Sequence, residues 1–140
     1  MASDHMRRLH SHYYGARPLS SLLLAATLVA ACTRVAAEPQ PGDATRGKQL
    51  FESQACGACH TVTGLPGADG QIGPNLTHIG AEAAARMPGQ DAETYLRTAL
   101  LFPNAFVVEG YPPNVMPLDY GQTLTRQQQR DLIAFLLSLR

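Results

Sequence analysis

Apolar residues in the second half of the chain recur at the spacing of short amphipathic helices. A broad apolar stripe follows Thr125 and predicts a final helix that this residue caps, with Leu132, Ile133, Phe135, Leu136, Leu137 and Leu139 on the buried face. A second helix is expected to begin at Asp91, with Glu93 favourable to the helix dipole in the first turn. Its apolar face is Tyr95, Leu96, Ala99 and Leu100, and Pro103 ends it.

Two more helical stretches and a long loop complete the pattern. Residues 44–57 are expected to form one helix, and residues 81–86 a shorter one. The stretch 61–80 is typical of a loop because glycine and proline recur in it, at Gly64, Pro66, Gly67, Gly70, Gly73 and Pro74. Helices this short depend on tertiary packing. The predicted fold class is therefore all-α, with several short helices around a common centre.

The N-terminus has the pattern of a targeting segment. Arg7, Arg8 and Arg17 precede an apolar run over 19–31, and Met6 is a candidate alternative start. Basic residues before a short apolar stretch are typical of a signal peptide, and a membrane span would need about 20 apolar residues. The protein is therefore expected to be exported, to the periplasm or the extracytoplasmic face of a membrane.

The apolar run ends at Cys32, after two alanines, and this junction resembles the lipobox of bacterial lipoproteins. We therefore expect residues 1–32 to be a lipoprotein-type signal peptide, with Cys32 as the lipidation site. Acyl chains at about 0.8 kcal/mol per buried methylene would hold the domain at a membrane. The alternative is ordinary cleavage after Ala37, which would discard Cys32. Residues 33–42 are predicted to be a flexible linker, and residues 43–140 the folded domain.

Charge excludes one large class of partner. The chain has 11 basic and 11 acidic residues, a formal net charge of zero, and no basic patch with interleaved aromatics. Nucleic acid is therefore not an expected partner. Residues 33–140 include eight basic and ten acidic side chains, so this part of the chain has a formal net charge of about −2.

The segment from Cys56 through Cys59 to His60 carries the strongest chemical signal. It reads C-x-x-C-H, the attachment signature for a covalent haem. Two thiols separated by two residues in a helical turn can reach both vinyl groups of one porphyrin, and the adjacent imidazole can reach the iron. A redox dithiol would need a βαβ context, and a zinc site would need a second cysteine pair. Neither is present, which leaves one covalent haem c as the predicted cofactor.

With these residues the sequence resembles the class I (mitochondrial-like) single-haem cytochromes c, bacterial members and the cytochrome c domains of oxidase subunits above all. The resemblance covers nearly all of 43–140. Gly47 and Phe51 match the N-terminal helix, the Gly-Pro-Asn-Leu run at 73–76 matches the loop after the haem motif, and the Val-Met-Pro run at 115–117 matches the distal methionine loop. The segment 106–113 departs from the family in being more apolar and rich in proline.

The resemblance implies a ligand set. The Pro74 carbonyl would accept a hydrogen bond from His60 and so orient the proximal ligand. Met116, among prolines at 112, 113 and 117, would be the sixth ligand. Met87 is the competing methionine, with core packing as its ordinary role. His78 is a competing ligand, with a surface or haem-edge position as its ordinary role.

The expected function follows from an iron with both axial positions filled. Such a site leaves no room for a small-molecule substrate, so we expect an electron carrier and no enzyme activity. The partners would be redox proteins, met at a membrane through the lipid anchor. Two alternatives stay open: a fixed cytochrome subunit of a larger respiratory or photosynthetic membrane complex, and an enzyme or gas sensor with a labile sixth ligand.

Overall fold

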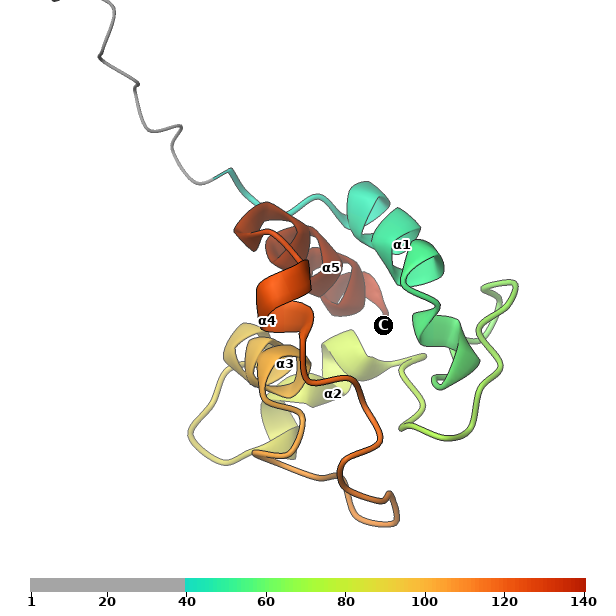
Figure 1. Cartoon of the computed structure of the whole chain (residues 1–140). Helices are drawn as coiled ribbons and strands as arrows, with labels where there is room; N and C mark the ends of the chain where they lie inside the picture. Colours follow the sequence, from blue (N-terminus) through green and yellow to red (C-terminus); the bar gives the residue numbers. More distant parts are fainter. Residues whose placement is uncertain (1–39) are drawn as a thin grey trace, which may run out of the picture. The chain divides into compact units, whose positions relative to one another are not determined.

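The computed structural model describes residues 40–140, which form helices joined by long loops (Figure 1). In chain order these are α1 (Ala44–Ser53), a 3₁₀ turn (Cys56–Ala58), α2 (Ile79–Arg86), α3 (Ala92–Leu101), α4 (Tyr120–Thr123) and α5 (Arg126–Ser138). This part of the chain holds no β-strand, only an isolated bridge between Thr61 and Asp69. The predicted all-α class is confirmed. None of the helices described has the length and hydropathy of a membrane span.

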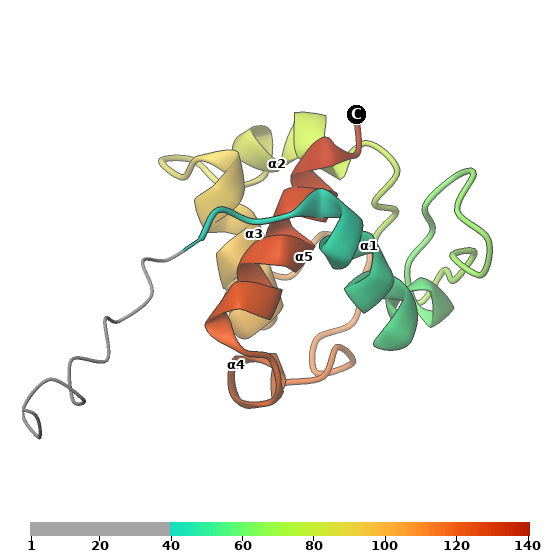
Figure 2. The ribbon, with the colours of Figure 1, turned by 90° about the horizontal axis from the view of Figure 1, so that it is seen from above.

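Helix α5 is the centre of the packing. It contacts α1, α2 and α3, and Figure 2 shows it lying between α1 and α3. The core is built mainly from the apolar faces of these helices, including Phe51, Ile79, Leu96, Leu100, Leu132, Ile133, Phe135 and Leu136. Of the apolar stripe expected along the last helix, Leu132, Ile133, Phe135 and Leu136 are buried, whereas Leu137 and Leu139 are half-buried. This buried face explains why a helix with many polar residues is stable in this position.

The crossing of α1 and α5 is unusually close. Gly47 faces the backbone of α5, where an added Cβ would lie 2.6 Å from the carbonyl carbon of Asp131 and 2.7 Å from Cβ of Phe135. One turn later Phe51 packs edge-on against Phe135, with ring centroids 5.5 Å apart. Gly47 and Phe51 thus both meet Phe135 across the helix crossing.

A buried carboxylate fastens the same two helices. The Asp131 side chain is 3 % exposed and accepts hydrogen bonds from the Asp43 backbone N–H (2.8 Å), Arg46 Nε (2.8 Å) and Gln127 Nε2 (2.8 Å). The Arg46 guanidinium and the other donors lower the pKa of Asp131 to about 2. A buried charge with this many donors is well compensated, so the network stabilises the α1–α5 pair.

The residues just before α1 also contact α5. The Gln40 carbonyl accepts a hydrogen bond from Arg130 Nε (2.9 Å), and the Pro41 carbonyl accepts one from Gln127 Nε2 (3.2 Å). The last three residues of the expected linker 33–42 are thus already packed on the domain. The rest of that linker, the expected signal peptide and Cys32 lie outside the described residues.

The helix ends are set by local chemistry. Asp91 caps α3 by accepting from the Thr94 backbone N–H, and Thr125 caps α5 in a capping box with Gln128, so both predicted caps are confirmed. The predicted helix 44–57 was wrong at its C-terminal end. Helix α1 ends at Ser53, because Ala55 adopts a left-handed conformation (φ 53°) that breaks the helix before the first cysteine. Helix α2 begins at residue 79, two residues earlier than expected.

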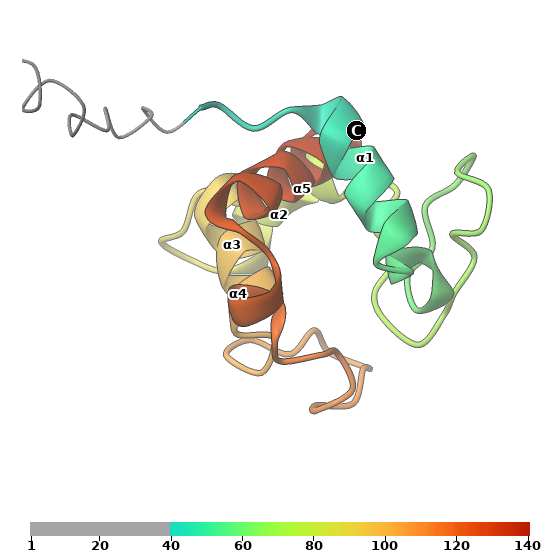
Figure 3. The same ribbon diagram turned by 45° about the horizontal axis from the view of Figure 1, so that its top comes forward.

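Two long loops leave this bundle and supply the functional residues. One follows the 3₁₀ turn and leads to α2, and the other joins α3 to α4. Figure 3 shows the first loop beside α1 and the second beyond α4. Within the second, Phe106 packs edge-on against Tyr95 of α3 with ring centroids 6.0 Å apart, which anchors the start of the apolar segment 106–113.

Candidate functional site

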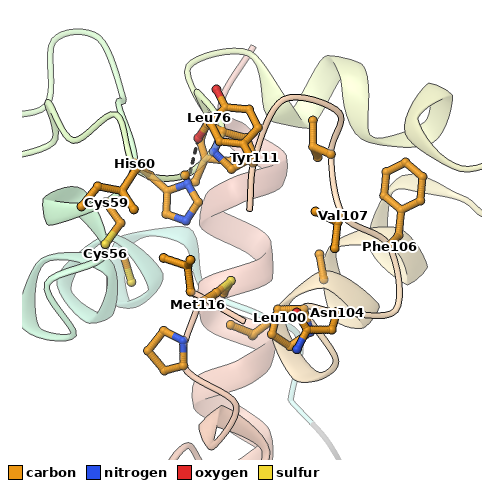
Figure 4. Close-up of a pocket in the computed structure, with 18 of the residues that line it drawn as sticks. Cys56, Cys59, His60, Leu76, Leu100, Asn104, Phe106, Val107, Tyr111 and Met116 are labelled. Atoms are coloured by element: carbon orange, nitrogen blue, oxygen red, sulfur yellow. Dashed lines mark hydrogen bonds between the residues drawn. The ribbon is translucent and has the colours of Figure 1, made fainter. Parts of the chain in front are cut away.

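The two cysteines and the histidine of the motif enter one cavity from a single turn. The carbonyl of Cys56 accepts hydrogen bonds from the backbone N–H of Cys59 (3.2 Å) and of His60 (3.0 Å). This compact turn brings Cys56, Cys59 and His60 to the same wall of the cavity (Figure 4). The two thiols are not joined by a disulfide, and burial raises the pKa of Cys56. Both sulfurs are therefore held close together for attachment to one ligand.

His60 is fixed in orientation and protonation. Its Nδ1 lies 2.8 Å from the carbonyl oxygen of Pro74, and a carbonyl can only accept, so Nδ1 carries the proton. Burial lowers the pKa of His60, and the bond to Pro74 partly opposes that shift. A neutral ring with its proton on Nδ1 leaves the Nε2 lone pair free. The imidazole is thus prepared as a metal ligand, in the manner that partners of ligating histidines usually provide.

Gly73 makes this orientation possible. A Cβ at position 73 would lie 2.5 Å from Cε1 and 2.8 Å from Nδ1 of His60. The Gly73 backbone N–H also donates to the Cys59 carbonyl at 2.8 Å. The loop backbone therefore lies directly against the imidazole ring, and glycine is required for this close approach.

Met116 reaches the same cavity from the loop between α3 and α4. Its half-buried side chain lines the cavity together with those of the neighbouring prolines Pro112, Pro113 and Pro117. Figure 4 shows the Met116 thioether and the His60 ring both directed into this space. An imidazole nitrogen and a thioether sulfur, from two loops far apart in the sequence, are thus brought to one site.

The cavity has a lining that suits a porphyrin. It has a volume of about 250 Å³, and its walls are largely apolar side chains from α2, α3, α5 and both loops, among them Leu76, Ile79, Leu96, Leu100, Val107, Val108 and Leu136. Polar groups from Arg86, Tyr111 and Tyr120 join the lining. Apolar walls, two thiols, a neutral imidazole and a thioether together suit a covalently attached haem.

The competing ligands do not line this cavity. Met87 follows α2 and packs against the hydrophobic core, and His78 is exposed where α2 begins. Zinc is also disfavoured, since no three His, Cys, Asp or Glu side chains gather in residues 40–140 as a metal site would need. The five residues singled out from the sequence, Cys56, Cys59, His60, Pro74 and Met116, all line one cavity.

Part of the wall was not expected. Val107 and Val108 belong to the segment 106–113, and the short helix α4 was not predicted from the sequence. The apolar character of 106–113 was the available signal. An apolar run beside a ligand loop is more readily explained as a cofactor wall than as an exposed turn.

These features define a helical domain that holds a porphyrin through a C-x-x-C-H turn. A family model for cytochrome c matches residues 44–140, more than half of the chain, and the chain therefore belongs to the cytochrome c family. Domains of this family bind haem c covalently and transfer electrons to and from redox proteins, and Cys56 and Cys59 fit the attachment motif. A comparison with curated proteins gives no match.

Proposed function

We propose that this protein is a tethered electron carrier whose haem iron is ligated by His60 and Met116. The observation that supports this proposal is the convergence of the His60 imidazole and the Met116 thioether on one apolar cavity. When bound, haem c supplies an iron that takes up and releases one electron. Histidine and methionine together are a ligand pair of electron-transfer cytochromes, and the soft thioether raises the reduction potential.

The residues of the chain have separate roles in this proposal. Cys56 and Cys59 would form the thioether bonds, His60 would supply its free Nε2, and Pro74 would hold the ring through the 2.8 Å bond to Nδ1. The apolar walls exclude water, which also favours the less charged ferrous state. With both axial positions filled by side chains, no substrate would reach the iron, so an enzymatic role is not proposed.

Partner contact would occur at the rim of the cavity. Ile72, Val107 and Val115 line the cavity and are 54 %, 37 % and 47 % exposed. Exposed apolar side chains around a redox centre suit a small, transient interface, under about 1,200 Å². Lipidation of Cys32 would keep the carrier at the outer face of the membrane, near membrane-bound partners.

The ligand assignment is tested with two matched variants. Met116→Leu and Met87→Leu each replace a thioether by an apolar side chain of similar volume. Met116→Leu should abolish the near-infrared methionine–iron band of the oxidised protein and allow the reduced protein to bind carbon monoxide. Met87→Leu should retain the band and exclude carbon monoxide. Loss of the band in Met87→Leu alone, or carbon monoxide binding by the wild type, would contradict the assignment.

The tether and the role as a carrier need their own measurements. Mass spectrometry of the protein from its native membrane should find a diacylated N-terminal Cys32, and a mature chain that begins after Ala37 would end the lipoprotein proposal. Mild detergent extraction should release the cytochrome as a separate species. Stable co-purification with a membrane redox complex would favour the fixed-subunit alternative instead.

A further inference from the structure

Two asparagine side chains connect the end of α3 to the loop that carries Met116. Asn104 Nδ2 donates to Asn114 Oδ1 at 2.9 Å, and the Asn114 backbone N–H donates to Asn104 Oδ1 at 2.8 Å. We call this pair the asparagine clasp. Both residues line the cavity, and Figure 4 shows Asn104 beside Leu100 at its wall.

The clasp is the main polar restraint on the methionine loop. Among the residues that the structure describes, the stretch 112–118 makes no hydrogen bonds other than the two with Asn104. Three of its seven residues are prolines, at 112, 113 and 117, and these have no N–H to donate. The loop therefore cannot hold itself together through its own backbone.

The backbone at Asn114 adds a second reason for the clasp. Asn114 has a φ of 61°, in the left-handed region that asparagine tolerates better than most residues with a side chain. This conformation redirects the chain two residues before Met116. Asn104 binds both the backbone N–H and the side chain of Asn114 and so stabilises the left-handed conformation at this position.

We propose that Asn104 is a positioning residue that keeps Met116 on the iron. The inference rests on the ligation proposed above. With the clasp formed, Asn114 is held in place, and only Val115 lies between it and the proposed ligand Met116. Without it, no side-chain anchor of this kind would lie between Phe106, which packs against Tyr95, and the start of α4 at Tyr120. A longer free segment gains more conformational entropy when the thioether leaves, so the open state becomes more populated.

The test measures how often the loop opens. Imidazole binds the oxidised iron only after Met116 leaves, and it is neutral, so added charge does not steer it. Asn104→Leu removes both bonds and should raise the imidazole binding rate about tenfold. Asn114→Gly relaxes the backbone and keeps the N–H donor, so the rise should be about threefold. Amide hydrogen exchange at position 114 should accelerate in Asn104→Leu, a readout independent of electron transfer.

Asn104→Asp is the matched control. Its carboxylate can still accept from the Asn114 N–H and, once the Asn114 amide turns round, from Nδ2 as well. Its imidazole rate and its amide exchange should therefore stay near those of the wild type. Equal rates in the wild type and Asn104→Leu, or a tenfold rise in Asn104→Asp as well, would overturn the positioning role.

The ligand proposal and the clasp proposal fail in different ways. If Met116→Leu keeps the near-infrared band, the ligand assignment is wrong and the clasp proposal falls with it. If Met116→Leu loses the band while Asn104→Leu keeps both the band and the wild-type imidazole rate, the ligation stands and only the clasp proposal is refuted. Should Asn104→Leu fail to fold, Asn114→Gly and Asn104→Asp still decide the question.

Discussion

Replacing Gly47 with alanine should separate the two helices on which the fold is centred. The added Cβ would lie 2.6 Å from the carbonyl carbon of Asp131 and 2.7 Å from Cβ of Phe135, and nearer still to the Asp131 carbonyl oxygen. Carbon atoms in comfortable contact lie about 3.5–4.0 Å apart. Because these contacts involve backbone or backbone-adjacent atoms, no rotamer change relieves them. Helix α1 would have to move by roughly 1 Å.

The size of the effect follows from two opposing contributions. Overpacking of this kind destabilises by about 1–3 kcal/mol, and a backbone contact belongs at the upper end of that range. Alanine is better than glycine in a helix by about 1 kcal/mol. The expected net loss in the free energy of unfolding is therefore about 2 kcal/mol, a large share of the roughly 5–15 kcal/mol of a typical domain.

Urea unfolding of the haem-loaded protein, followed by circular dichroism, measures this loss. Gly121→Ala is the matched control, because a Cβ there meets only Leu101 Cδ2 at 3.9 Å. That variant should be as stable as the wild type or slightly more stable. A Gly47→Ala protein as stable as Gly121→Ala would refute the reasoning, since it would mean that α1 and α5 can separate freely.

Two further predictions concern the polar network and the proximal loop. The folded-state pKa of Asp131, about 2, lies below its unfolded value, so its contribution is present at neutral pH and is lost as pH falls from about 5 to 2. Asp131→Asn should therefore cost about 2 kcal/mol at pH 7 in urea unfolding, and a gap to the wild type that does not narrow towards pH 2 would contradict this. Gly73→Ala should push the His60 ring away from Pro74, lowering stability by about 1–3 kcal/mol and shifting the reduction potential. An unchanged reduction potential and an unchanged unfolding curve would contradict this prediction, because they would show that the His60 ring can accommodate the added methyl group.

The features that the sequence predicted best are the local ones. Asp91 and Thr125 cap helices because a short oxygen-bearing side chain bonds an amide two or three residues ahead, which any chain with that order of residues can do. The C-x-x-C-H motif is local in the same sense, since a single turn brings its three functional side chains together. The predicted helix 44–57 failed because nothing in the residue type at position 55 announces a left-handed alanine. That conformation lies directly before the 3₁₀ turn Cys56–Ala58.

The features that the sequence did not predict depend on distant partners. Asp131 stands in the apolar stripe of α5, and an isolated carboxylate there indicates a solvent-facing position. It is buried because Arg46 and the Asp43 amide, more than eighty residues earlier, meet it across the helix crossing. Gln129 is also buried, but its partner is local, since its side chain donates to the carbonyl of Leu124, five residues earlier. A hydrophobic pattern identifies the buried face of a helix. It does not identify the polar partners on other elements that allow a charged side chain to be buried there.

The candidate site contains residues that a local motif identifies and residues that only long-range contacts bring into place. The two groups differ in how well the sequence alone predicts them. Cys56, Cys59 and His60 follow from spacing. Met116 follows instead from the resemblance of its loop to the family, and the structure adds that Met116 lines the cavity while Met87 packs against the core. The asparagine clasp is harder still to predict from the sequence. Neither Asn104 nor Asn114 belongs to a motif, and their pairing emerges only when the loop closes. The proposed sixth ligand, distant in sequence from the haem motif, thus depends on a contact that no local pattern encodes.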